Sequence, residues 1–282
     1  MVYANKKKEL IEQGYTTISG LITDIELVNL KEALERVIKK VNADPYKHNA
    51  RLTYDGPDFK DTLNTWQLIS PELYEEDIVN LLGKDELQSA VRYVLGTKDL
   101  RFGYAYAFWS PKKVDYKLVW HRDIVDANTY NESGIPNHVC ITIALNDDDG
   151  FWAIPGSHKR GPTEFENPHV EKTNDTNLPN TENVVVKAGD ILFFNSWLIH
   201  RGEAKAGTKR RMIQFRIEPI EEQLSANIIS PWMQDEEYLR KLPVNVRSMV
   251  ENLTNFHNSS PPSLAEIYRL VKKGAKTKYA EL

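Results

Sequence analysis

Apolar residues recur at helical spacing in the first part of this chain. Between residues 23 and 44 they lie three or four positions apart, at Leu27, Leu30, Leu34, Val37, Ile38 and Val41. This spacing predicts an amphipathic helix with one buried stripe. The segment Thr23–Glu26 has the form of a capping box that opens the helix, and Asp44-Pro45 ends it.

Further along the chain the period changes from helical to twofold. Residues 46–70 show no clear period, whereas residues 75–95 predict one or two helices that close at Gly96. From Arg101 onward, short β-branched or aromatic segments alternate with Gly, Pro, Asn and Asp turns, which is typical of strands. The predicted strands cover residues 101–109, 139–145, 150–155, 184–186, 190–194 and 212–217.

These patterns predict one α+β domain with a mainly β core, a sandwich or jelly roll. Helices return near the C-terminus, at residues 236–242, 244–253 and 264–273. We therefore divide the domain, residues 1–282, into an N-terminal helical flank (1–100), a core (101–218) and C-terminal helices (219–282). The polar excursion at residues 162–183 is a candidate lid, because compact domains keep such long loops mainly when they cover a site.

Composition excludes several classes of protein. The 282 residues are 41% apolar and 27% charged, which excludes a disordered chain, and the single cysteine excludes an intrachain disulfide. With 36 Lys and Arg against 40 Asp and Glu, the net charge of −4 disfavours nucleic-acid and anionic-membrane partners.

We find no apolar run that predicts a signal peptide or a membrane span, so we expect a cytoplasmic protein. The C-terminal helices make a dimer conceivable, and the oligomeric state is otherwise open.

Three residues are candidate metal ligands. On a strand, His121 and Asp123 of Trp120-His-Arg-Asp123 point to the same side while Arg122 points away. His200, from a distant strand, would complete a two-histidine, one-carboxylate triad, an arrangement that favours non-haem iron(II). The alternative is a histidine held by a neighbouring carboxylate near the surface. A second match, His169-Val-Glu171, lies in the polar excursion and we interpret it as a solvated loop.

An arginine on the last predicted core strand is a candidate anion ligand. Alternation places Arg211 on the same face as Ile213 and Phe215, and an arginine heading an inward face needs an anion such as the far carboxylate of a dicarboxylate. We assign Arg210 to a solvated basic run. Thr142 either contacts the same co-substrate from a strand face of small residues or packs in the core.

The chain resembles the phytanoyl-CoA dioxygenase family of iron(II)/2-oxoglutarate oxygenases from about residue 9 to residue 217. The resemblance rests on an ordered set of segments: Ile11–Tyr15 with Leu21–Glu26, Trp120–Asp123, Ile154–Lys159 with its Pro-Gly-Ser-His signature, and the Gly-Asp turn of Ala188–Phe194 before His200.

The resemblance implies a double-stranded β-helix of the cupin-like jelly-roll type and an Fe(II)- and 2-oxoglutarate-dependent dioxygenase that consumes O2. It implies iron ligation by His121, Asp123 and His200, and binding of the distal 2-oxoglutarate carboxylate by Arg211. The expected reaction is hydroxylation, or another oxidation, of a C–H bond in a small polar metabolite or natural-product intermediate. Candidate substrate residues are Tyr104, Tyr106, Arg122 and Trp152.

Two other functions stay open from the sequence. One is a metal-dependent jelly-roll hydrolase or isomerase that does not use 2-oxoglutarate, and the other is a catalytically silent binding protein of the same fold. We interpret two further residues as structural: Cys140 as a buried inert thiol, and His158 as part of a tight turn that braces a neighbouring loop.

Overall fold

The strands form two antiparallel sheets, and the structure, a computed structural model, describes residues 2–55, 58–123, 130–172, 177–222, 229–265 and 268. The larger sheet has the order β1-β9-β6-β11-β4-β3-β2, and the smaller has the order β5-β10-β7-β8. The strands are β1 (Tyr15–Ile18), β2 (Arg51–Asp55), β3 (Asp58–Thr65), β4 (Leu100–Trp109), β5 (Tyr116–Lys117), β6 (Val139–Ala144), β7 (Asp148–Ala153), β8 (Glu182–Val186), β9 (Ile191–Asn195), β10 (His200–Ala204) and β11 (Arg211–Pro219). This arrangement confirms the predicted α+β jelly roll.

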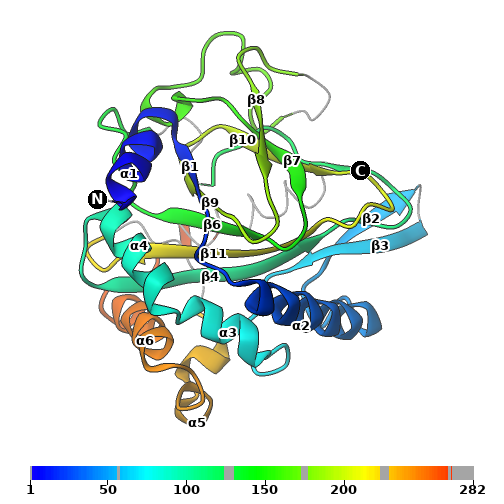
Figure 1. Cartoon of the computed structure of the whole chain (residues 1–282), viewed down its shortest axis with the longest axis vertical. Helices are drawn as coiled ribbons and strands as arrows, with labels where there is room; N and C mark the ends of the chain where they lie inside the picture. Colours follow the sequence, from blue (N-terminus) through cyan, green and yellow to red (C-terminus); the bar gives the residue numbers. More distant parts are fainter. Residues whose placement is uncertain are drawn as a thin grey trace.

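Helices cover one face of the larger sheet (Figure 1). The helices are α1 (Val2–Gln13), α2 (Asp24–Ala43), α3 (Glu76–Leu82), α4 (Asp85–Leu95), α5 (Glu236–Leu239) and α6 (Val244–Ser259), with short 3-10 turns η1 (Ser157–Lys159) and η2 (Pro231–Gln234). None of the described helices is both long and apolar enough to cross a membrane.

The larger sheet is buried on both faces. Its outer face carries Ile141, Ile213 and Phe215, which join one apolar cluster with residues of the helices, such as Leu34 of α2. Its inner face packs against the smaller sheet, where Cys140, Ala144, Leu192 and Phe194 meet Phe151, Ala153, Val184 and Val186. Burying two faces requires both layers, so the helical flank is part of the core rather than an appendage.

Helix α2 forms as the sequence predicts. The Thr23 hydroxyl accepts from the Glu26 amide while the Glu26 carboxylate accepts from the Thr23 amide, so the capping box is complete. The helix ends at Ala43, and α4 ends at Gly96 with a positive φ of 74°. Glycine adopts this left-handed conformation without a Cβ penalty.

Some segments form helices or strands that the sequence patterns did not predict. Residues 46–70, which show no clear period, contain the β2–β3 hairpin, and the lysine-rich N-terminus forms α1. In both segments tertiary packing decides the structure, since few apolar residues mark a face. The predicted helix at 264–273 lies mostly outside the described residues.

Candidate metal centre

The strand pairing fixes the two candidate histidines next to each other. His121 and His200 form an isolated antiparallel bridge in which each backbone amide donates to the other's carbonyl oxygen, at 2.9 and 3.0 Å. Two residues later, the Asp123 amide donates to the Ser196 carbonyl oxygen at 2.9 Å. All three candidate ligands are therefore positioned by backbone hydrogen bonds between segments that are remote in sequence.

The three side chains converge. The distance from His121 Nε2 to Asp123 Oδ1 is 3.5 Å, and that from His200 Nε2 to the same oxygen is 3.9 Å. One ligand atom from each residue lies within 4.8 Å of the others, and this is the one group of potential metal ligands found among the described residues. Ligand atoms that share an ion at 2.0–2.2 Å lie at most about 4.4 Å apart, so a small inward movement of these side chains would let all three bind one metal ion.

Hydrogen bonds fix the tautomer of both imidazoles. Nδ1 of His121 lies 2.9 Å from the Val119 carbonyl oxygen, and Nδ1 of His200 lies 2.9 Å from the Leu198 carbonyl oxygen. Because a carbonyl oxygen only accepts, both Nδ1 atoms carry a proton, and each Nε2, which lies on the Asp123 side, is the atom that would bind a metal. Backbone carbonyls that orient ligating histidines in this way are typical of protein metal sites.

Asp123 is ionised despite its burial. Burial raises the pKa of Asp123, but the adjacent His200 and His121 outweigh that effect and hold the pKa below its usual range. The Cys140 thiol donates to Asp123 Oδ2 at 3.2 Å, and burial raises the pKa of that thiol well above its usual value. Cys140 is thus buried and protonated, which confirms its interpretation as an inert thiol.

Arg122 points away from the metal centre, as strand alternation predicts. It is fully buried, and its guanidinium donates to the carbonyl oxygens of Ser157 and Arg160. Arg122 therefore supports the turn after β7, and the structure does not bring it to the ligand side of the triad.

His158 also supports this turn. Its Nε2 donates to the Ile11 carbonyl oxygen at 3.1 Å, and its ring lies against Gly14, where a Cβ would come within 2.6 Å of Nδ1. Burial lowers the pKa of His158 to about 4. The interpretation of this residue as a structural brace is confirmed.

The two neighbouring arginines lie on opposite sides of β11. Arg211 shares a face with Ile213 and Phe215 as predicted, but this is the outer face, and its Nε is 2.6 Å from Glu35 on α2. Arg210, assigned above to a solvated run, is only 8% exposed and forms a two-point ion pair with Asp148. The prediction of which arginine is buried is therefore wrong, because helices rather than a ligand cover the apolar face of β11.

The remaining candidate residues divide between the inner face and the rim. Tyr104 and Tyr106 lie side by side on β4 with tilted rings whose centroids are 4.1 Å apart, and Thr142 is buried on the inner face of β6 opposite Gln214. Trp152 of β7 is half-buried and donates from Nε1 to Glu203. The structure therefore groups Tyr104, Tyr106 and Thr142 with the triad and places Trp152 outside that group.

The candidate lid is attached next to His121. The amide of Glu171 donates to the Trp120 carbonyl oxygen at 2.7 Å, and Val170 and Leu178 pack with Trp120 in a small apolar cluster. These contacts hold both described parts of the excursion, residues 162–172 and 177–183, against the segment that carries the metal ligands.

Two inner-face residues beside the triad were not singled out as site residues from the sequence. Arg216 pairs with Cys140 across β11 and β6, and His138 immediately precedes β6. Alternation along each strand indicates their common face. His138 lies two residues before Cys140, and Arg216 lies two residues after Gln214. From the sequence alone, neither residue has an identifiable partner.

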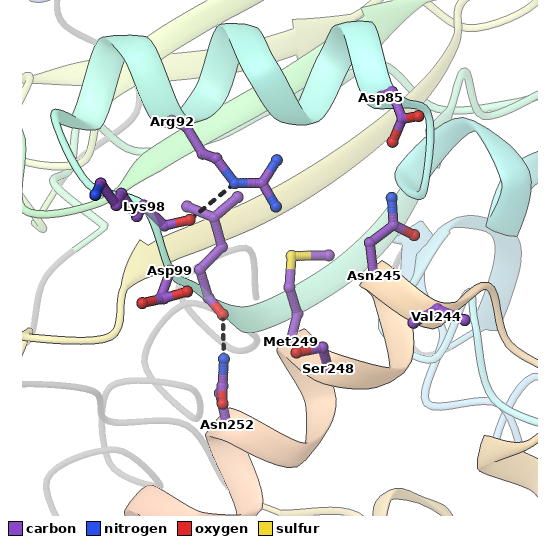
Figure 2. A pocket seen from close by; sticks show the side chains of 10 residues that line it. Asp85, Arg92, Lys98, Asp99, Val244, Asn245, Ser248, Met249 and Asn252 are labelled. Atoms are coloured by element: carbon purple, nitrogen blue, oxygen red, sulfur yellow. Dashed lines mark hydrogen bonds between the residues drawn. The ribbon is translucent and has the colours of Figure 1, made fainter.

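A separate groove lies between α4 and α6, with a volume of about 460 Å³. Figure 2 shows polar side chains along it, with Arg92 donating to the Lys98 carbonyl oxygen and Asn252 to that of Leu100. These polar groups bond to backbone across the helix junction, and the groove lies on the helical layer away from the triad. We therefore assign no chemistry to it.

Comparisons with known proteins agree with this site. The family model described as phytanoyl-CoA dioxygenase matches residues 10–213, which include the whole triad. Among curated protein sequences, none matches the chain.

Solved structures with the same fold include three that we describe here. EctD from S. alaskensis, with 2-oxoglutarate and 5-hydroxyectoine, is 16% identical with a TM-score of 0.60 and covers 81% of this chain and 82% of its own. HygX from Streptomyces hygroscopicus, with nickel, 2-oxoglutarate and hygromycin B, is 22% identical with a TM-score of 0.54, covering 77% and 87%. SnoN, a non-heme alpha-ketoglutarate-dependent epimerase from nogalamycin biosynthesis, is 16% identical with a TM-score of 0.56, covering 78% and 83%. At these identities the likeness shows a shared fold.

Proposed function

Because the chain belongs to the phytanoyl-CoA dioxygenase family, it is an iron(II)- and 2-oxoglutarate-dependent dioxygenase, and we propose that it hydroxylates a C–H bond of a small polar metabolite, releasing succinate and CO2. The observation that carries the proposal is the convergence of His121, Asp123 and His200 on one position. Two imidazoles and one carboxylate on one side of an ion leave the other side open for co-substrates.

The residues present fit a ferrous ion. Both Nε2 lone pairs are held ready by backbone carbonyls, and Asp123 supplies the negative charge. When bound, the iron with 2-oxoglutarate and O2 supplies the oxidant for C–H cleavage. The protein's part is to hold the ligand atoms rigidly, to orient the co-substrate and to exclude water.

We propose that Arg210, rather than Arg211, binds the distal carboxylate of 2-oxoglutarate. Arg210 is buried and directly precedes β11, with the strand parity of the inner-face residues Gln214 and Arg216, whereas a side chain on the outer face cannot reach the interior. Asp148 holds one edge of the Arg210 guanidinium through Nε and Nη2. The fork has five N–H donors, so another edge can still bind a carboxylate. Thr142 lies on the same inner face and is a second candidate contact.

The class of substrate, a small polar metabolite, is the more specific part of the proposal. The half-buried tyrosines at 104 and 106 give one wall of the region beside the triad both aromatic surface and hydroxyl groups. Two of the structural neighbours hold small polar molecules, 5-hydroxyectoine and hygromycin B, which supports a substrate of this class. The net charge of −4 argues against a nucleic acid.

One anaerobic titration tests the proposal. Apoprotein mixed with iron(II) and 2-oxoglutarate should develop the visible charge-transfer band of the chelate, and admitting air should release succinate. Asp123→Ala should abolish both signals. Metal binding without the band would indicate a hydrolase or isomerase that does not use 2-oxoglutarate, and no metal binding at all would indicate a silent binding protein.

A further inference from the structure

Three buried side chains near the triad carry nitrogen atoms that lack hydrogen-bond partners. Among the described residues, Nε of Arg216, both ring nitrogens of His138 and Nε1 of Trp197 are buried and unpaired. The three residues are 8%, 2% and 9% exposed, so water does not satisfy these atoms. The His138 and Trp197 rings lie 6.1 Å apart between centroids. Unpaired buried polar groups are costly, and a cluster of them next to an active centre indicates a missing ligand.

Strand register places this cluster at the metal centre. Arg216 lies directly opposite Cys140, whose thiol is 3.2 Å from Asp123. Trp197 follows Ser196, whose carbonyl oxygen accepts from the Asp123 amide. His138 lies two residues before Cys140 and thus on the same face of the strand. Arg216 and His138 both interact electrostatically with Asp123, and the Trp197 ring lies beside His138, so the three side chains belong to the neighbourhood of the metal centre.

Two buried arginines in this region share one carboxylate. The two guanidiniums of Arg101 and Arg216 share the single carboxylate of Glu218, at 3.0 and 2.9 Å. The other hydrogen bonds of Arg101 go to the carbonyl oxygens of Ile220 and Glu222, which carry no net charge. Asp123 is the further negative group that acts on Arg216, so Glu218 and Asp123 together offset the two guanidiniums, while Nε of Arg216 is still without a hydrogen-bond acceptor.

We propose that Arg216, His138 and Trp197 form the subsite for a carboxylate of the primary substrate, so that the enzyme acts on a small carboxylic acid. This inference rests on the proposed function, because it assigns a ligand to the same centre. One guanidinium edge with two neutral donors suits the single charge of a carboxylate. A phosphate, with its double charge, calls for more cations than this cluster holds.

Binding can be measured before the substrate is known. Straight-chain, cyclic and aromatic monocarboxylates, each paired with its primary amide, are titrated by calorimetry into the anaerobic iron(II) protein with 2-oxoglutarate. At least one acid should bind the wild type about tenfold or more tightly than its amide, because the amide loses the charge-assisted hydrogen bonds. Arg216→Gln should abolish this preference and Trp197→Phe should reduce it.

Matched variants separate binding from folding. Glu218 keeps Arg101 as a partner when Arg216 is replaced, and Arg216→Lys retains the charge, so it should keep part of the preference. Arg240→Gln should bind acids as the wild type does, because Arg240 is exposed and among the described residues it forms an ion pair with Glu236, four positions earlier. Thermal unfolding of each variant checks that it folds.

The outcomes distinguish this proposal from the proposed function. No preference for any acid in the wild type, or a preference that survives in Arg216→Gln, overturns the substrate subsite. Loss of the 2-oxoglutarate band in Arg216→Gln also overturns it, because Arg216 would then serve the co-substrate. Absence of the band in the wild type instead contradicts the oxygenase reaction, and acid preference measured by calorimetry would still support the anion subsite.

Discussion

The two faces of the seven-stranded sheet carry different chemistry. The outer face of β6 and β11 presents Ile141, Ile143, Ile213, Phe215 and Ile217 to the helices. The inner face of the same two strands presents Cys140, Thr142, Gln214 and Arg216 towards the metal centre. Both faces are buried, so burial alone does not mark a ligand site. Polar residues at every second position of a buried strand face do mark a ligand site.

This difference has a direct consequence for mutations. Changes on the outer face should alter stability and leave ligand binding intact, whereas changes on the inner face should alter binding first. Arg210 and Arg211 are adjacent in sequence, yet they belong to different sides of this division. They therefore provide its sharpest test.

The largest effect should follow from Asp123→Ala. Loss of the only carboxylate in the triad should weaken iron(II) binding about a hundredfold or more, since even residues that merely orient ligands contribute 10–100-fold. Equilibrium titration with iron(II) measures this. The outer-face control Ile213→Val should cost about 1 kcal/mol in the free energy of unfolding and leave iron affinity unchanged. A similar loss of affinity in both variants would contradict the division between the faces.

The second test compares Arg210 with Arg211. Replacing Arg210 alone would leave Asp148 buried and unpaired, so the informative variant is Arg210→Gln with Asp148→Asn. This double variant should raise the KM for 2-oxoglutarate by about ten- to a hundredfold through loss of a charge-assisted pair. Arg211→Gln should leave KM within about twofold, because its partner Glu35 is more than half exposed. The reverse pattern would restore Arg211 as the co-substrate ligand.

The triad could be predicted from sequence because its geometry is local. Twofold alternation puts His121 and Asp123 on one side of a strand whatever the strand packs against, and His200 follows from the conserved order of motifs in the resemblance. The face of Arg211 could not be predicted in the same way. Alternation shows which residues share a face, but not whether a helix or a second sheet covers that face. The apolar neighbours of Arg211 pack against helices, and this contact depends on the tertiary structure.

A third prediction concerns His158, a buried group that serves stability alone. The pKa of His158 is about 4 in the folded protein against about 6.5 when unfolded, so the folded state binds its proton less readily. Stability should therefore be unaffected above pH 6.5 and should fall as the pH drops towards 4, by about 3 kcal/mol from this residue. Urea unfolding at a series of pH values should give a flatter dependence for His158→Gln than for the wild type. Equal slopes in the two proteins would contradict the assigned role.

The smallest effect is expected at the start of α2, the helix that carries Glu35. Thr23→Ala removes the acceptor for the Glu26 amide and should lower the free energy of unfolding by about 1 kcal/mol, whereas Thr23→Ser should restore it. Because α2 contacts Arg211 through Glu35, a loosened helix would change the KM for 2-oxoglutarate only if Arg211 bound the co-substrate. Measuring stability and KM on the same Thr23→Ala protein thus tests the division between the faces without touching any arginine, and we expect the stability to fall while KM stays constant.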